Sequence, residues 1–194
     1  MPFLAISLRA ARDLGGFMKV SFKRETKETR VEVSLSSVGR GTATADTGVE
    51  LLDEILCLLC SSSGFDLDLK ARGDLETGDH HTTEDVGIAL GSALAKLAKA
   101  GTGSSIVPSG ACLAMAAVAF GEPWFRGDFQ FQGRELGGMA LENFGHFMRT
   151  LAYNGNFTLH LSAHGGEDRR KVEAMAIALG CALRESLLDG KIAP

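Results

Sequence analysis

The sequence predicts an α+β fold in which one sheet-and-helix unit occurs twice along the chain. Two F-x-L-x-L segments, Phe65–Leu69 and Phe157–Leu161, alternate apolar and polar residues as half-buried strands do. Each precedes a helical segment with the same short pattern, Ile88-Ala-Leu-Gly-x-Ala-Leu94 and Ile177-Ala-Leu-Gly-x-Ala-Leu183. The chain has 194 residues, 45% of them hydrophobic, so one protein can bury both units in a real core.

The first half contains three strand-like and two helical segments. Alternation at a period of two predicts strands at Val20–Lys23 and Thr29–Leu35, and glycines at 39, 41 and 48 indicate turns. Residues 48–60 are typical of a helix with a broad apolar face, which stops at the serines and glycine of 61–64. After the Phe65–Leu69 strand, Val86–Ala100 is a helix rich in Ala and Leu that ends at a glycine.

The second half follows the same plan. Residues 119–131 are strand-like and 141–152 helical, and the Phe157–Leu161 strand leads through a glycine-containing loop to a helix at 171–188. Two such halves are expected to pack helix layer against helix layer, related by a pseudo-twofold axis. We therefore divide the chain into an N-terminal extension (1–17), a first repeat (18–101) and a second repeat (102–194), packed as one globular unit.

No partner that requires a basic or a long apolar surface is expected. The formal net charge of −4 argues against nucleic acid and anionic membranes. No segment reaches the roughly 20 apolar residues that span a bilayer, so no membrane partner is predicted. The opening residues are faintly like a signal peptide, but their apolar run is short and no small-residue cleavage site follows.

The four cysteines predict buried free thiols in a reducing cytoplasm. Cys57 and Cys60 form a C-x-x-C inside an apolar run, and Cys112 and Cys181 are isolated. A zinc knuckle usually needs four ligands, and a redox C-x-x-C usually follows a strand. Neither condition is met here, so we expect structural thiols and a cytoplasmic protein.

Two adjacent histidines and an acidic pair stand at a predicted helix start, in GDHHTTEDVGIALG (78–91). His81 and Glu84 are three residues apart and share one helix face, so they can converge on a cation such as Mn, Fe, Ni or Zn. His80, pointing elsewhere, would serve a second metal or a site across an interface. The alternative is a plain capping loop, in which Asp79 and Thr83 cap the helix and acidic residues favour its positive end. Capping leaves two histidines unexplained, so we favour metal binding.

The three other histidines differ in how well they qualify as metal ligands. His160 lies on the strand face opposite Leu159 and Leu161, and it is a candidate third ligand beside His80 and Glu84. His146 falls within the predicted helix at 141–152, and we assign it a structural role. His164 belongs to the loop before the second motif, exposed to solvent or in contact with an anion.

Taken together, the motifs resemble the imidazoleglycerol-phosphate dehydratase family over about residues 20–188. The family's R-x-T-x-E-T is found at 24–29 and its T-G-[IV]-x-F-[FL]-D-H at 47–54, there ending in Glu54. Its G-D-L-x-x-D-x-H-H-T-x-E-D-x-G-I is nearly intact at 73–88, and its T-L-H strand is at 158–160. The resemblance covers essentially the whole chain after the N-terminal extension.

The resemblance implies a carbon–oxygen hydro-lyase of histidine biosynthesis acting on a phosphorylated imidazole. Its fold would be a duplicated α+β unit of the ribosomal protein S5 domain 2-like kind, with subunits forming trimers and then a 24-subunit shell. Active sites between subunits would hold two manganese ions that stabilise the substrate as an imidazolate while a proton and a hydroxyl leave. The implied metal ligands are His80, His81, Glu84, His160, Glu173 and Glu54, and the implied catalytic residues are Glu28 and Glu84.

The second half departs from the family pattern. The family's G-x-N-x-H-H-x-x-E reads here as 165–173, with Arg169 and Arg170 in place of its two histidines. A guanidinium has no free lone pair and stays protonated, so it cannot ligate a metal. We therefore expect at most one intact manganese site. Because the family's phosphate-binding arginines are Met115 and Glu122 here, we assign the substrate phosphate to Arg169 and Arg170.

Two functions fit these observations. The first is a dehydratase with an altered metal centre, and the second is a non-catalytic or repurposed paralogue that keeps the fold and the assembly. A zinc hydrolase is a poor fit, because the sequence has neither H-E-x-x-H nor a G-x-S-x-G elbow.

Overall fold

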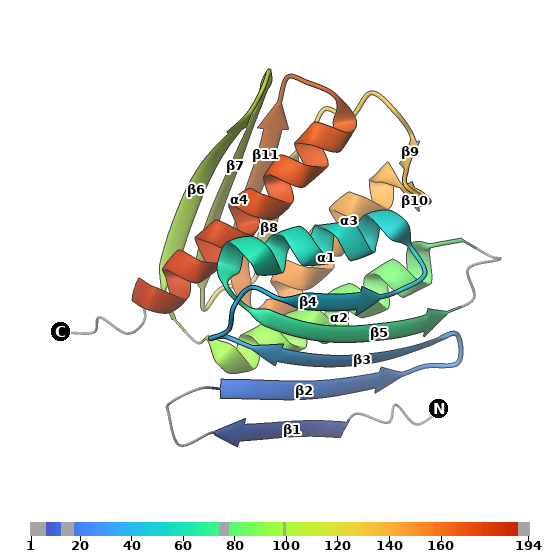
Figure 1. Cartoon of the computed structure of the whole chain (residues 1–194), viewed down its shortest axis with the longest axis vertical. Coiled ribbons are helices and arrows are strands. Elements are labelled where there is room, and N and C mark those ends of the chain that lie inside the picture. Colours follow the sequence, from blue (N-terminus) through green and yellow to red (C-terminus); the bar gives the residue numbers. More distant parts are fainter. Residues whose placement is uncertain (1–6, 13–17, 74–77, 99, 190–194) are drawn as a thin grey trace.

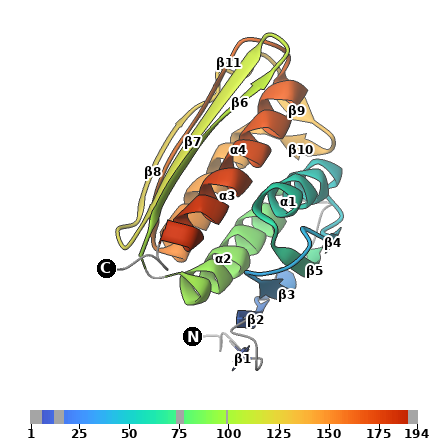
Figure 2. The same ribbon diagram turned by 60° about the vertical axis from the view of Figure 1, so that its left-hand side comes forward.

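The protein has two β-sheets on the outside and two layers of helices between them (Figures 1 and 2). The structure is a computed structural model that describes residues 7–12, 18–73, 78–98 and 100–189. The first sheet has the strand order β1-β2-β3-β5-β4, and the second has the order β6-β7-β11-β8. This arrangement places the helix layers face to face, as the repeat predicts.

The first unit runs from β1 to α2. Its strands are β1 (Ser7–Arg12), β2 (Met18–Glu25), β3 (Thr29–Ser36), β4 (Ala43–Asp46) and β5 (Asp66–Gly73). Strands β4 and β5 are parallel and the other neighbours are antiparallel. Helix α1 (Glu50–Ser63) connects the parallel pair, and α2 (His80–Leu97) follows β5.

The second unit repeats this topology. Its strands are β6 (Thr102–Ser109), β7 (Cys112–Phe120), β8 (Trp124–Asp128) and β11 (Phe157–His164), with a small ribbon of β9 (Glu135–Leu136) and β10 (Met139–Ala140). Strands β8 and β11 are parallel, α3 (Leu141–Gly155) connects them, and α4 (Asp168–Asp189) follows β11. The strands β2, β3, β4 and β5 thus correspond to β6, β7, β8 and β11, which confirms the predicted duplication.

Glycines let the two helix layers approach closely at equivalent places. Helix α2 packs on α3, and α4 packs on α1. A Cβ atom on Gly91 would lie 2.7 Å from the carbonyl oxygen of Leu151, and one on Gly180 would lie 2.5 Å from that of Leu59. The Ala-Leu-Gly pattern of each unit therefore marks the point where its second helix crosses the first helix of the other unit.

The core is continuous through both units, and the F-x-L-x-L segments supply part of it. Phe65 and Phe157 are buried at the equivalent strand starts, and the alternate leucines of β5 and β11 also face the helices. The residues that follow α1 and α3, Gly64 (φ 76°) and Asn156 (φ 55°), adopt the left-handed conformation that commonly ends a helix and that glycine and asparagine tolerate best.

Some sequence-based expectations about the elements are wrong. The predicted strand at 119–131 is broken, because β7 ends at Phe120 and a turn precedes β8. Strands β4 and β6 lie in stretches for which we predicted no strand. Residues 7–12 of the predicted N-terminal extension pair with β2 as an edge strand. Cys57 is exposed, contrary to prediction, although Cys60 and Cys112 are buried as free thiols. None of the described helices is long and apolar enough to cross a membrane.

Candidate functional site

The two adjacent histidines form the first turn of α2 and point to different neighbours. The Nδ1 atom of His80 lies 3.0 Å from the side-chain oxygen of Asn143 on α3. The Nδ1 atom of His81 lies 3.0 Å from a carboxylate oxygen of Glu28, in the loop between β2 and β3. Both rings are about half exposed, and their centroids are 5.7 Å apart. The pair therefore offers imidazoles in two directions from one helix end.

A hydrogen-bond chain fixes which nitrogen of His80 is free. Asn143 is buried and donates its side-chain N–H to Asp79 at 3.0 Å, so its oxygen must face His80 as an acceptor. His80 then carries its proton on Nδ1 and leaves the Nε2 lone pair open. This Nε2 atom lies 4.0 Å from a carboxylate oxygen of Glu84. An imidazole oriented in this way is prepared to ligate a metal.

The capping alternative does not describe this helix start. The carboxylate of Asp79 accepts from Asn143, and α2 has no side-chain cap hydrogen bond. Asp85 turns inward and pairs with Arg24. Neither acidic residue acts as the capping interpretation requires.

A buried ion pair holds the loop that carries Glu28 against α2. The Nε atom of Arg24 lies 2.6 Å from Asp85, and the two side chains are only 16% and 10% exposed. The same carboxylate accepts hydrogen bonds from Thr29 and Thr26, which bracket the loop. The R-x-T-x-E-T segment is thus fixed at both ends, and Glu28 is presented to His81.

His146, which we predicted to be structural, belongs to this cluster. Its side chain is exposed on α3, and its ring stands edge-on to that of His80 with the centroids 5.5 Å apart. The cluster therefore includes three imidazoles, from His80, His81 and His146, and two carboxylates, from Glu28 and Glu84. Its donor chemistry suits manganese or a similar transition metal.

The second motif makes an ion pair where the first has imidazoles. A guanidinium nitrogen of Arg169 lies 2.5 Å from Glu54 on α1 and 3.9 Å from Glu173 on its own helix. The hydrogen bond to Glu54, with the charge of that carboxylate, holds the pKa of Arg169 above its ordinary value. Arg170 is exposed, and no described side chain pairs with it. The two predicted ligands Glu54 and Glu173 thus face a permanent cation.

The two contacts occupy equivalent places in the repeat. His80 and Arg169 each lie eight residues before the isoleucine of the shared helix pattern. His146 and Glu54 each lie eleven residues before the phenylalanine of the F-x-L-x-L strand. The helix pair α2–α3, which joins the two units, therefore makes its contact through two imidazoles, and the equivalent pair α1–α4 makes it through a guanidinium and a carboxylate. Only the first arrangement has nitrogen lone pairs to offer a metal, because arginine has none to donate.

His160 is on the other side of the second sheet. It is exposed on the outer face of β11, whereas α3 and α4 cover the inner face. His80 and His81 begin α2, which packs on the helix side against α3. The fold therefore separates His160 from the first motif within one chain. Among the described residues, no three His, Cys, Asp or Glu side chains are arranged to hold one metal ion.

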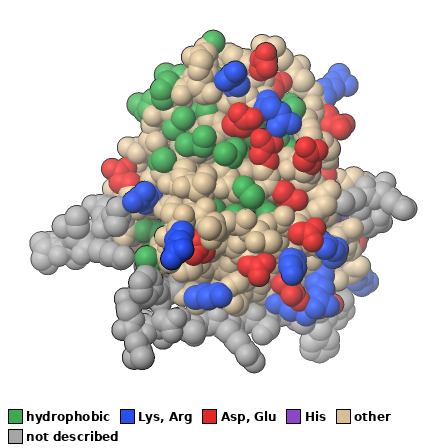
Figure 3. All heavy atoms as spheres, viewed as in Figure 1, with side chains coloured by type: hydrophobic (Ala, Val, Ile, Leu, Met, Phe, Trp, Pro, Cys, Tyr) green, Lys and Arg blue, Asp and Glu red, His purple; other side chains and the backbone are tan. Residues whose placement is uncertain are grey.

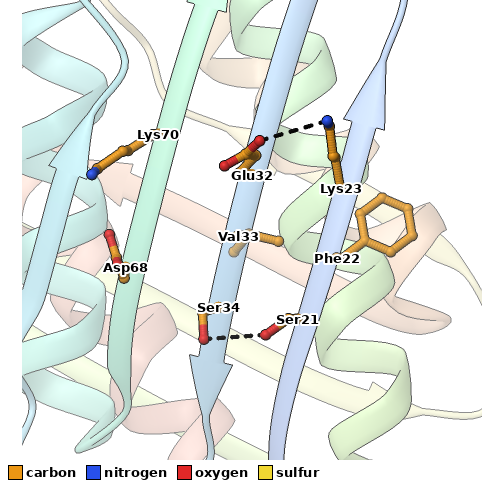
Figure 4. A pocket seen from close by; sticks show the side chains of 8 residues that line it. All are labelled: Ser21, Phe22, Lys23, Glu32, Val33, Ser34, Asp68 and Lys70. Carbon is orange, nitrogen blue, oxygen red and sulfur yellow. Dashed lines mark hydrogen bonds and ion pairs between the residues drawn. The ribbon is translucent and has the colours of Figure 1, made fainter. Parts of the chain in front are cut away.

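A depression of about 320 Å³ on the outer face of the first sheet lacks comparable chemistry (Figure 4). Four of its polar side chains are paired with one another, since Lys23 pairs with Glu32 and Ser21 bonds Ser34. It contains no imidazole or thiol. We assign it no function.

The comparison with known families agrees with the motif at α2. Residues 47–183, from just before α1 into α4, match the family model described as imidazoleglycerol-phosphate dehydratase. The chain belongs to the imidazoleglycerol-phosphate dehydratase family. Both the intact first motif and the altered second motif lie inside the match.

Curated relatives carry the same family name. An imidazoleglycerol-phosphate dehydratase of Desulforudis audaxviator is 40% identical over 177 residues, which cover 86% of this chain and 90% of the relative. One of Methanocaldococcus jannaschii is 37% identical over 174 residues, covering 87% of this chain and 88% of the relative.

Solved structures of the imidazoleglycerol-phosphate dehydratase family share the fold. The crystal structure from Pyrococcus furiosus has a TM-score of 0.74 at 30% identity, covering 84% of this chain and 92% of its own. The one from Staphylococcus aureus has a TM-score of 0.74 at 27% identity, covering 81% and 93%. These likenesses confirm the predicted duplicated α+β fold.

Proposed function

We propose that the chain is an imidazoleglycerol-phosphate dehydratase, a hydro-lyase of histidine biosynthesis that acts in the cytoplasm. The observation that carries the proposal is the first-motif cluster, in which His80 has a free Nε2 and His81 faces a fixed glutamate. Membership of the family supports the reaction and its phosphorylated imidazole substrate. Four free thiols fit a reducing compartment.

The proposed metal content is one manganese ion per chain, at the first motif. His80, His81 and Glu84 would supply its ligands at sites shared with other copies, because their imidazole nitrogens and carboxylate oxygen suit such an ion but do not converge on one point within a single chain. We leave Glu54 and Glu173 out of the ligand set, since Arg169 already neutralises them. When bound, the ion supplies positive charge that stabilises the substrate imidazole as an anion.

Glu28 is the proposed proton acceptor. Its carboxylate is 60% exposed and lies beside His81, so a substrate held at the first motif would meet it from the solvent side. The Arg24–Asp85 ion pair keeps its loop in place without contacting the substrate. A positioned carboxylate can accept a proton from carbon when a nearby charge stabilises the anion that forms.

The site is proposed to be completed by a second copy of the chain. His160 lies on an outer face that is unusually apolar, where Ile106, Leu113, Met115 and Trp124 are each about half exposed or more. In the view of Figure 3, hydrophobic side chains gather at the upper left, where β6 lies, and charged ones gather at the upper right and along the lower part. A second copy docked on the apolar face would bring its own first motif toward His160. A trimer-based assembly, extending to 24 subunits, follows from the family resemblance.

Of the two arginines predicted to bind phosphate, Arg170 is the better placed. Arg169 is engaged by Glu54, whereas Arg170 is exposed and has no described partner. It lies near the turn between β6 and β7, on the same end of the molecule as His164. We therefore propose Arg170 as a phosphate contact and Arg169 as a structural cation.

The test combines metal analysis with a dehydratase assay on protein purified without chelators. We expect one manganese per chain and measurable turnover of imidazoleglycerol phosphate. Mixing two inactive variants, His81→Ala and His160→Ala, should restore part of the activity if the site lies between copies. Metal-free protein without turnover would reject the dehydratase and favour the repurposed paralogue, which the Arg169–Glu54 ion pair also fits.

A further inference from the structure

A groove between α2 and α3 opens directly beside the first motif. Its volume is about 270 Å³, and its walls include Glu84 from α2 and His146, Arg149 and Tyr153 from α3. Glu84 and His146 are also members of the first-motif cluster. The groove is therefore a continuation of the candidate site along the two helices.

Arg149 brings a positive charge that no described carboxylate neutralises. Its guanidinium carbon lies 5.6 Å from the ring centroid of Tyr153, one helical turn further along α3. Arg24 and Arg169, in contrast, each form an ion pair with a carboxylate. A guanidinium stacked on an aromatic ring is held in position while its N–H groups remain free to donate.

The spacing along α3 directs this charge toward the motif. His146 and Arg149 are three residues apart, so they lie on the same face of the helix. The ring of His146 in turn stands against that of His80. Imidazoles that suit a metal thus lie at one end of the groove, and a planar cation that suits an oxyanion lies further along.

We propose that this groove is a subsite for the phosphate group of the substrate, with Arg149 as its charged contact. The inference rests on the proposed function and adds a binding residue from the chain that carries the first motif. A phosphate ester carries up to two negative charges and three acceptor oxygens, so it has room for Arg149 together with a cation from a second copy. Arg149 is a binding residue here and takes no part in proton transfer.

The experiment measures inorganic phosphate binding and substrate kinetics on the same manganese-loaded proteins. Arg149→Gln should weaken phosphate binding in calorimetry by about tenfold or more, since charge-assisted hydrogen bonds are lost. The KM for imidazoleglycerol phosphate should rise by a similar factor while kcat changes little. Arg149→Lys should keep part of both affinities. Arg184→Gln, an exposed position on α4, is the matched control and should behave as the unchanged protein.

The outcomes separate the subsite from the reaction. If the unchanged protein turns over substrate and Arg149→Gln has the same KM and phosphate affinity, the subsite is wrong and the dehydratase stands. If the unchanged protein binds phosphate without turning over substrate, and Arg149→Gln abolishes this binding, the anion subsite stands and the dehydratase is wrong. Absence of phosphate binding by the unchanged protein overturns the subsite. Equal melting temperatures of Arg149→Gln and Arg184→Gln exclude a folding defect as the cause.

Discussion

Gly180→Ala should destabilise the protein by forcing the second helix pair apart. The added Cβ would lie 2.5 Å from the backbone oxygen of Leu59, whereas ordinary contact begins at 3.4 Å, so α4 must shift by the difference of about 0.9 Å. It would also lie 2.0 Å from the hydroxyl of Ser62. That hydroxyl donates to the carbonyl of Leu58 at 2.7 Å, so turning it away sacrifices a hydrogen bond.

The change in unfolding free energy is the difference between the cost of overpacking and the gain from placing alanine in a helix. Overpacking of this kind costs about 1–3 kcal/mol, and a Gly-to-Ala change within a helix returns about 0.5–1 kcal/mol. With the backbone clash and the lost hydrogen bond, we expect a net loss of about 2 kcal/mol in unfolding free energy.

The assay is urea unfolding followed by far-UV circular dichroism at one fixed protein concentration. Gly145→Ala, within α3, is the matched control, because its Cβ would meet only the edge of Phe129 at 3.4 Å. It should be neutral or slightly stabilising. A Gly180→Ala protein as stable as Gly145→Ala would refute the close-approach reasoning.

Three further predictions test the ion pairs and the thiols. Asp85→Asn leaves Arg24 without its charged partner and should cost about 3 kcal/mol in the same assay. Unchanged stability would argue against a stabilising role of this ion pair. Replacing Arg169 and Arg170 together by His should raise bound manganese, measured by mass spectrometry, from one to two ions per chain, and an unchanged count would contradict the assigned role of Arg169. Burial raises the pKa of the Cys60 thiol to about 12. Iodoacetamide at about pH 8 should therefore label the exposed Cys57 and leave Cys60 unlabelled until the protein unfolds. Labelling of Cys60 in the folded protein would contradict this prediction.

The duplicated fold was predictable because its signals are local. The period of β5 and β11 and the glycine spacing of α2 and α4 can be read within short windows of sequence. Strand β6, with the sequence TGSSIVPS, escaped prediction because glycine, serine and proline are poor strand formers. Strand β7, CLAMAAVAF, carries alanine and apolar residues on both faces, so burial alternates where hydrophobicity does not.

The candidate site was predictable only in part, since His80, His81, Glu84 and Glu28 were named from the motifs, whereas His160, Glu54 and Glu173 lie apart from the cluster. The approach of His81 to Glu28, and of Arg24 to Asp85, joins residues that only the fold brings together. The contact of His146 with His80 was not foreseen, because a histidine within a helical pattern resembles any other polar position. The distance of eleven residues from His146 to the following F-x-L-x-L segment equals that of Glu54, and this shared spacing was the available signal.

The outer faces of the two sheets differ in polarity. The outer face of the first sheet exposes the ion pairs of Lys23 with Glu25 and Glu32 to solvent. The outer face of the second sheet exposes the apolar side chains of Ile106 and Leu113. A chain with one apolar face can bury that face against a second copy, and a closed symmetric assembly stops growing when no such face is left exposed. The two halves of the duplicated fold therefore differ in their outer faces: one carries paired charges, and the other carries exposed apolar side chains.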